Sequence, residues 1–192
     1  MRERRVSAQG RESRELILDT ALEVIGRRGY GATSLRDIAG EVGMTQAGML
    51  HHFGTKENLL VEVLRRRDAA TREALSEQAD AEPPSVRVAR RNAETPDLVH
   101  LYSNLLVAAS AADHPARAFF EERQEGVHAV VAADIRARQE AGAMPASLDA
   151  DMAATVLLAL SDGLQLQRGV DPSIDIAAVL AWTWKRLAGS PG

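Results

Sequence analysis

Apolar residues recur at helical spacing along almost the whole chain, and no segment shows the strict alternation that is typical of a β-strand. In the first such segment Ile17, Ala21 and Val24 follow one another at i, i+4 and i+7, which places them on one helix face. The pattern predicts an all-α protein with about nine helices. We expect them over residues 14–28, 35–42, 45–53, 56–79, 85–93, 97–112, 115–141, 149–166 and 175–188.

Composition excludes several classes of protein. The 192 residues are 45% hydrophobic, which suffices for a packed core, and none is cysteine, which excludes a disulfide scaffold and a thiolate zinc site. The longest run without Asp, Glu, Lys or Arg, residues 98–112, is shorter than the roughly 20 residues of a membrane span. The charged N-terminal segment has no apolar stretch of the signal-peptide kind. We therefore expect a cytoplasmic protein without membrane contact.

The net charge of −4 hides an uneven distribution along the chain. Residues 1–72 hold 13 Arg and Lys against 10 Asp and Glu, whereas residues 73–192 hold 10 against 17. Such an asymmetry is typical of a nucleic-acid-binding segment joined to an acidic body. The charge distribution therefore favours DNA or RNA as a partner of the N-terminal part.

Two short helices joined by a glycine turn lie between residues 34 and 53. Ser34, with Asp37 three residues on, predicts an N-cap for the first helix, and Gly43 ends it. Thr45 can cap the second helix, and Thr55 the next one after Gly54. This order predicts a helix-turn-helix, in which the first helix braces the second in the major groove.

The second helix offers the side chains that base recognition requires. Gln46 can pair bidentately with adenine, and Ala47 can contact a thymine methyl group. We expect phosphate contacts from Thr45, His51, His52 and Lys56, and from backbone N–H groups at the helix N-termini after Ser34 and Thr55. The adjacent histidines point about 100° apart on a helix, so they do not form the i, i+4 metal pair, and no metal site is predicted.

The sequences GATSLRDIA at residues 31–39 and HHFGTKENLL at residues 51–60 resemble the DNA-binding domain of TetR-family transcriptional regulators. Residues 113–120 and 157–165 resemble the BetI-like form of the family's regulatory domain. The resemblance implies an all-helical homodimer without a cofactor. By position it implies base contacts from Gln46, Ala47 and Gly48, and phosphate contacts from Thr33, His51, His52 and Lys56. Many members carry a DNA-contacting tyrosine where this chain has Leu50.

The expected function is a DNA-binding transcriptional repressor that a small-molecule effector releases from a palindromic operator. We predict a DNA-binding domain over residues 1–54, whose first 13 residues form a flexible arm, and a regulatory and dimerisation domain over residues 55–192. The Pro83-Pro84 pair favours a hinge. The arm arginines, which are either DNA contacts or merely solvated charges, are Arg2, Arg4, Arg5 and Arg11.

Two further sets of candidate residues lie in the later part of the chain. Polar side chains on apolar helices could orient an effector. These are His100, Tyr102, Asn104, Gln124 and His128. The helix over 152–166 is apolar around much of its circumference, which favours a two-fold interface with the last helix. The interface candidates are Val156, Leu160, Leu164, Trp182 and Trp184.

An enzyme is not expected, because the chain has no nucleophile motif, no glycine-rich phosphate loop and no telling pair of carboxylates. The alternative to a regulator is a helical ligand-binding or interaction module without sequence-specific DNA binding. Leu50 is the residue that favours this alternative.

Overall fold

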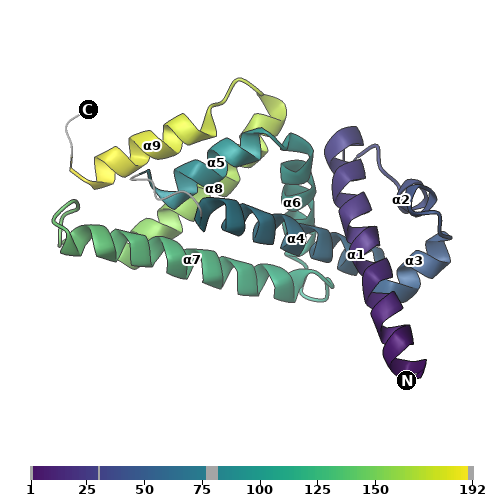
Figure 1. The fold of residues 1–192 in the computed structure, drawn as a ribbon. Coiled ribbons are helices and arrows are strands. Elements are labelled where there is room, and N and C mark those ends of the chain that lie inside the picture. The colour runs from purple at the N-terminus through teal and green to yellow at the C-terminus, as the bar shows by residue number, and fades with distance from the viewer. Residues whose placement is uncertain (1, 30, 77–81, 190–192) are drawn as a thin grey trace. The chain divides into compact units, whose positions relative to one another are not determined.

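The computed structural model describes residues 2–29, 31–76 and 82–189, and within these residues every regular element is an α-helix (Figure 1). This confirms the predicted fold class. The nine helices of the described residues are α1 (Arg2–Arg28), α2 (Leu35–Val42), α3 (Gln46–Phe53), α4 (Lys56–Ser76), α5 (Pro84–Ala93), α6 (Pro96–Ala108), α7 (Arg117–Glu140), α8 (Ala150–Val170) and α9 (Ile176–Leu187).

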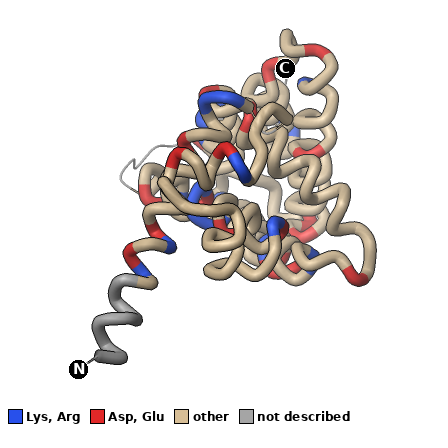
Figure 2. The backbone as a smooth tube through the Cα atoms, turned by 90° about the vertical axis from the view of Figure 1, so that its right-hand side faces the viewer, with Lys and Arg blue, Asp and Glu red and all other residues tan. Residues whose placement is uncertain are grey.

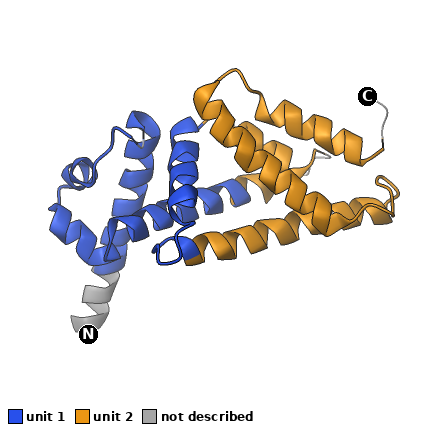
Figure 3. Cartoon of the chain, turned by 180° about the vertical axis from the view of Figure 1, so that it is seen from behind, with its two compact units in different colours: residues 1–72, 95–117 blue, residues 73–94, 118–192 orange. Residues whose placement is uncertain are grey.

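The chain forms two compact units, which are coloured separately in Figure 3. Unit 1 comprises residues 1–72 and 95–117, and unit 2 comprises residues 73–94 and 118–192. Unit 1 thus holds α1, α2, α3, most of α4 and α6, and unit 2 holds α5, α8, α9 and nearly all of α7. The predicted functional boundary at residues 54/55 differs from this division by packing, and it stays a prediction.

Unit 1 is built around the apolar face of α1, which packs against α2, α3 and α6. Ile17, Val24 and Ile25 on this face are almost completely buried, as the helical spacing predicted. Helix α1 begins at Arg2, where we expected an arm, because the Arg- and Glu-rich segment before Ser13 consists mainly of good helix formers. Residues 2–9 are described by their backbone alone, so whether Arg2, Arg4 and Arg5 contact DNA stays a prediction.

Unit 2 is held together by the packing of α9 against α5 and α8. Asp149 and Asp175 cap α8 and α9 by accepting backbone N–H bonds, and Pro84 occupies the first turn of α5. The largest completely buried side chains of its core are Ile135, Leu157 and Leu180. None of the helices described is both long and apolar enough to span a bilayer.

Helix α4 was predicted to end near Ala79, and this residue lies outside the described part of the chain. The last residue of α4 in the structure is Ser76.

Candidate nucleic-acid interface

Helices α2 and α3 are separated by a short turn whose ends are fixed by capping groups. The Ser34 hydroxyl oxygen accepts the Asp37 N–H, and the Asp37 carboxylate accepts the Ser34 N–H at 2.8 Å. The Ser34 hydroxyl also donates to the Asp37 carboxylate, and this bond together with the one from the Ser34 N–H lowers the pKa of Asp37, so its negative charge is present at neutral pH at the positive end of α2. At the other end of the turn, Thr45 Oγ1 accepts the Gly48 N–H at 3.0 Å. The predicted helix-turn-helix is therefore present.

The inner face of α3 holds it against the rest of unit 1. Met49 is fully buried and Phe53 is 6% exposed, so the helix is anchored near its middle and at its end. Gly54 ends α3 at φ 79°, and its N–H bonds to the Leu50 carbonyl. The orientation of α3 is consequently set by apolar packing on one side only, and the opposite side remains open.

Arg14 of α1 contacts the end of α3, and the sequence did not predict this. Its Nη1 donates to the His52 carbonyl oxygen at 2.8 Å, and its Nη2 forms an ion pair with Glu62 of α4 at 3.1 Å. The guanidinium carbon also lies 4.3 Å from the centroid of the Phe53 ring. One side chain thus joins α1, α3 and α4 at the C-terminal end of α3. No local pattern reveals it, because the nearest of these partners is 38 residues away.

Ion pairs fix α2 and α4 to α1 in the same unit. Arg27 and Arg28 both contact the carboxylate of Glu41, at 3.0 Å in the case of Arg27. Arg66 of α4 pairs with Glu15 and Asp19, which raises the pKa of its guanidinium further. These arginines brace the helices through acidic partners rather than forming a free basic surface.

The candidate DNA-contacting residues lie mostly on the open side. Gln46, Ala47 and His51 are exposed, as are Thr45 and Lys56 at the helix starts. Gly48, Leu50 and His52 are half-buried. Ser34 is exposed, but its hydroxyl is engaged with Asp37, and the Thr33 hydroxyl donates to the Gly29 carbonyl oxygen at 2.7 Å. The structure therefore brings one compact set together on the outer face of α3.

Two other expectations concern this part of the chain: that His51 and His52 form no metal pair, and that the N-terminal part is positively charged. The His51 and His52 rings lie 6.2 Å apart, edge to face, and the described residues hold no group of three or more His, Asp or Glu suited to a metal ion. Basic and acidic residues follow each other closely along the backbone in Figure 2. Net positive charge alone thus does not distinguish this face, on which Gln46 and Ala47 are exposed.

The five effector candidates fall into different parts of the fold. His100 and Asn104 are exposed on α6 in unit 1, and the amide of Asn104 donates to the His100 carbonyl oxygen. Tyr102 is buried in the same unit, and the guanidinium carbon of Arg67 lies 5.7 Å from the centroid of its ring. In unit 2, Gln124 is exposed. The remaining candidate, His128, contacts the Asp151 carbonyl oxygen and Thr155 Oγ1.

The dimer candidates divide into exposed and buried residues. Val156 of α8 and Trp182 of α9 are about half exposed. Leu164 and Trp184 are buried within unit 2, where the Trp184 indole N–H donates to Ser85 Oγ at 2.8 Å. Helical spacing places Leu164 and Trp184 toward the core of their own unit, and Leu160 packs partly against it. The exposed apolar side chains of α8 that were not predicted are Met152, Leu166 and Val170.

An all-helical protein in which a capped helix-turn-helix presents one polar face belongs to the class of helix-turn-helix proteins. Residues 17–63 match the model of the bacterial regulatory proteins of the tetR family. Over these residues, about a quarter of its length, the chain is similar to the TetR family.

Curated relatives that match this chain are transcriptional regulators. Over 61 residues the chain is 38% identical to the transcriptional repressor KstR2 of Mycobacterium tuberculosis, and over 62 residues it is 40% identical to the regulator BetI of Agrobacterium fabrum. These alignments cover 32% and 29% of this chain and 30% of each relative. The chain thus matches about a third of these curated relatives, which are transcriptional regulators and not enzymes. The BetI-like character of its later half stays a prediction.

A solved structure shows the same fold over nearly the full length. A transcriptional regulator from Saccharomonospora viridis, crystallised in complex with choline, superposes with a TM-score of 0.68. The two chains are 29% identical, and the match covers 91% of this chain and 94% of the other.

Proposed function

We propose that this protein is a DNA-binding transcriptional repressor, and that a small-molecule effector releases it from a palindromic operator. The observation that carries the proposal is the exposed Gln46-Ala47 pair at the N-terminus of α3, on a helix that is anchored to unit 1 by Met49 and Phe53. A major groove about 12 Å wide admits such a helix, and small residues let its backbone approach the bases. The names of the relatives KstR2 and BetI support the regulatory role.

In this proposal α3 reads the bases and its surroundings hold the phosphates. Gln46 pairs with an adenine, and Ala47 contacts a thymine methyl group. Thr45, His51 and Lys56 are exposed around that pair and contact the backbone. Leu50 is half-buried, so it offers an apolar contact at most. Arg14 acts as a positioning residue because it holds the end of α3 from behind.

Specific recognition of a palindrome requires a two-fold dimer. A dimer places its two recognition helices about 34–36 Å apart, one turn of DNA. The exposed apolar residues of α8 and α9 support a homodimer through these helices, since Met152, Val156 and Trp182 are each close to half exposed or more. The small residues Ala159 and Gly163 on α8 allow close approach of a second helix.

Release by an effector is a coupling between two sites. An effector lowers DNA affinity only if it binds the released conformation more tightly, and a 5- to 150-fold effect requires about 1–3 kcal/mol. The choline complex of the Saccharomonospora viridis regulator supports a small-molecule response in this chain as well.

Selection from random duplexes at moderate salt tests the proposal. We expect recovery of an inverted repeat, followed by a band shift with the selected site. Failure to recover any inverted repeat would contradict sequence-specific repression and favour a ligand-binding or interaction module instead.

Two substitutions separate base contacts from phosphate contacts. Gln46→Ala should cost about 1–3 kcal/mol on the best operator and relax the preference at one base pair of each half-site. Lys56→Ala should weaken binding to all sequences and reduce the slope of log affinity against log salt by about one per subunit. Affinities are measured by fluorescence anisotropy at several salt concentrations. Arg65→Ala is the control, because it removes one positive charge from the same helix at a residue paired with Glu62. A change of base preference in Lys56→Ala would contradict the phosphate assignment.

The dimer interface is tested by placing charge on its exposed apolar face. Val156→Arg should shift the protein from dimer to monomer in sedimentation equilibrium and abolish binding to the full palindrome, because a charge would be buried without a partner. Val130→Arg is the matched control, since Val130 of α7 is similarly exposed but lies outside α8 and α9. Dimerisation that survives Val156→Arg and fails in Val130→Arg would place the interface elsewhere.

A further inference from the structure

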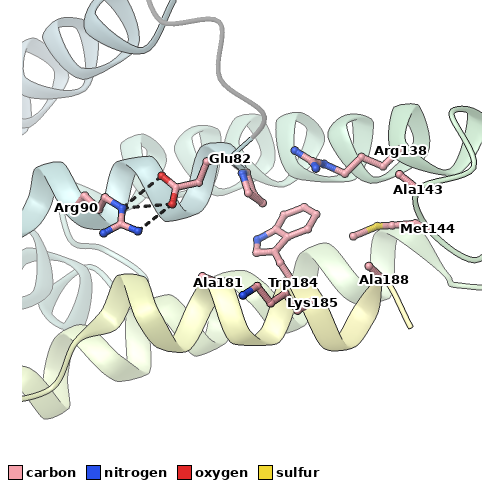
Figure 4. A pocket seen from close by; sticks show the side chains of 10 residues that line it. Glu82, Arg90, Arg138, Ala143, Met144, Ala181, Trp184, Lys185 and Ala188 are labelled. Carbon is pink, nitrogen blue, oxygen red and sulfur yellow. Dashed lines mark hydrogen bonds and ion pairs between the residues drawn. The ribbon is translucent and has the colours of Figure 1, made fainter. Parts of the chain in front are cut away.

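A cavity of about 390 Å³ opens within unit 2 between the start of α5, the end of α7 and the end of α9 (Figure 4). This volume lies at the lower end of the range of small-molecule sites. None of the five effector candidates from the sequence lines it. The side chains that the argument uses are Glu82, Arg90, Arg138, Met144, Trp184 and Lys185.

The floor of the cavity is apolar and rigid. Trp184 and Met144 are 4% and 6% exposed, so both belong to the core while one side of each faces the cavity. The bond to Ser85 satisfies the indole N–H, and it fixes the ring in one orientation. Alanines at positions 143, 181 and 188 keep the space around the ring open.

The rim of the cavity carries an excess of positive charge. Among the residues that the structure describes, three cationic side chains and one carboxylate line it. That carboxylate, on Glu82, is already held by Arg90, with Nη2 2.9 Å from Oε1, and Figure 4 shows this pair on one side of the indole. Arg138 lies 5.4 Å from the centroid of the Trp184 ring and bonds to Asp134, which does not line the cavity.

Lys185 is the cation that remains for a ligand. It is exposed, and no hydrogen bond or ion pair joins its ammonium group to another residue that the structure describes. Its neighbour Trp184 supplies the apolar surface beside it. An ammonium group next to a buried aromatic floor suits a ligand that combines a negative charge with an apolar body.

We propose that this cavity binds a small organic anion, in which a carboxylate pairs with Lys185 and a compact apolar body lies against Trp184 and Met144. Binding itself is independent of DNA recognition. That the anion acts as an effector rests on the proposed function.

Isothermal titration of the full-length protein with benzoate, 2-naphthoate and decanoate tests the proposal. We expect saturable binding of at least one of these acids, and weaker binding of its neutral amide. Benzyltrimethylammonium and choline supply the opposite charge, and we expect neither to compete. Preferential binding of the cations, or no saturable binding of any of the three acids, would overturn the proposal.

Two variants locate the site. Lys185→Gln should weaken binding of the acid at least about tenfold, because a charge-assisted hydrogen bond is lost. Arg186→Gln removes the same charge from the next residue of α9, which does not line the cavity, and should leave the affinity unchanged. Ala181→Leu fills the cavity and should abolish binding while its unfolding midpoint shows that the fold is retained. Equal effects of Lys185→Gln and Arg186→Gln would show a non-specific charge effect and overturn the assignment.

The role as an effector is measured separately by a band shift. Lys185→Gln should bind the operator as the unchanged protein does, and only the unchanged protein should be released by the acid. If the protein binds the acid but no operator, the cavity proposal stands and the proposed function fails.

Discussion

Replacing Phe53 with alanine is expected to lower the free energy of unfolding of the full-length protein by about 3–5 kcal/mol. The ring is almost completely buried at the end of α3, and Arg14 packs on its face. The substitution leaves a cavity and also removes the aromatic partner of the guanidinium. Urea denaturation followed by circular dichroism measures the change.

Leu16→Ala is the control for this prediction. Leu16 is an apolar residue of the same unit, but it is 55% exposed, so its truncation should cost less than about 1 kcal/mol. A loss in Leu16→Ala as large as in Phe53→Ala would show that burial at the end of α3 does not determine the stability of unit 1.

Gly29→Ala should destabilise the protein by about 1–2 kcal/mol from the backbone conformation, with a smaller addition from one close contact. Gly29 has a φ of +85°, which disfavours any residue with a Cβ, and an added Cβ would lie 2.9 Å from Asp97 Oδ1. Gly26→Ala is the matched control, since this glycine lies within α1 with nothing within 4 Å of an added Cβ. There alanine should stabilise the helix by up to about 1 kcal/mol.

A double-mutant cycle separates the two causes. In Gly29→Ala combined with Asp97→Ala the close contact is absent, so the combined loss should be smaller than the sum of the two single losses. The cost of the positive φ should remain. Strict additivity would show that the Asp97 contact contributes nothing, and a stabilising Gly29→Ala would contradict both causes.

Capping residues and helical spacing explain why so much of the helix-turn-helix could be predicted from the sequence. The caps at Ser34, Thr45 and Thr55 are each a hydroxyl that accepts an N–H three residues on, so spacing alone identifies them. The short, polar helix expected over residues 85–93 is confirmed as α5. The outward position of Ala47 follows from the same helical period that buries Met49 and Phe53, whereas Gln46 is exposed at the first residue of α3.

Contacts between distant residues could not be predicted in the same way. Arg14 meets its partners through tertiary packing, and nothing in its sequence neighbourhood indicates this. Helix α8 has enough apolar residues for two apolar faces. The sequence does not show which of these faces packs against the rest of unit 2. In the structure Leu164, a predicted interface residue, is buried, while Leu166 is exposed. The cavity beside Trp184 likewise joins residues from three separate helices.

Unit 1 consists of two separate stretches of the chain, and this limits how segments of the protein can be exchanged with those of similar proteins. The chain leaves unit 1 after residue 72 and re-enters it at residue 95, so α6 packs on α1 from a later part of the sequence. A chimera joined at a single crossover after the helix-turn-helix would pair α1 with a foreign α6. Exchange of DNA specificity between such proteins therefore calls for three crossovers, after residues 72, 94 and 117, so that α1 and α6 are transplanted together.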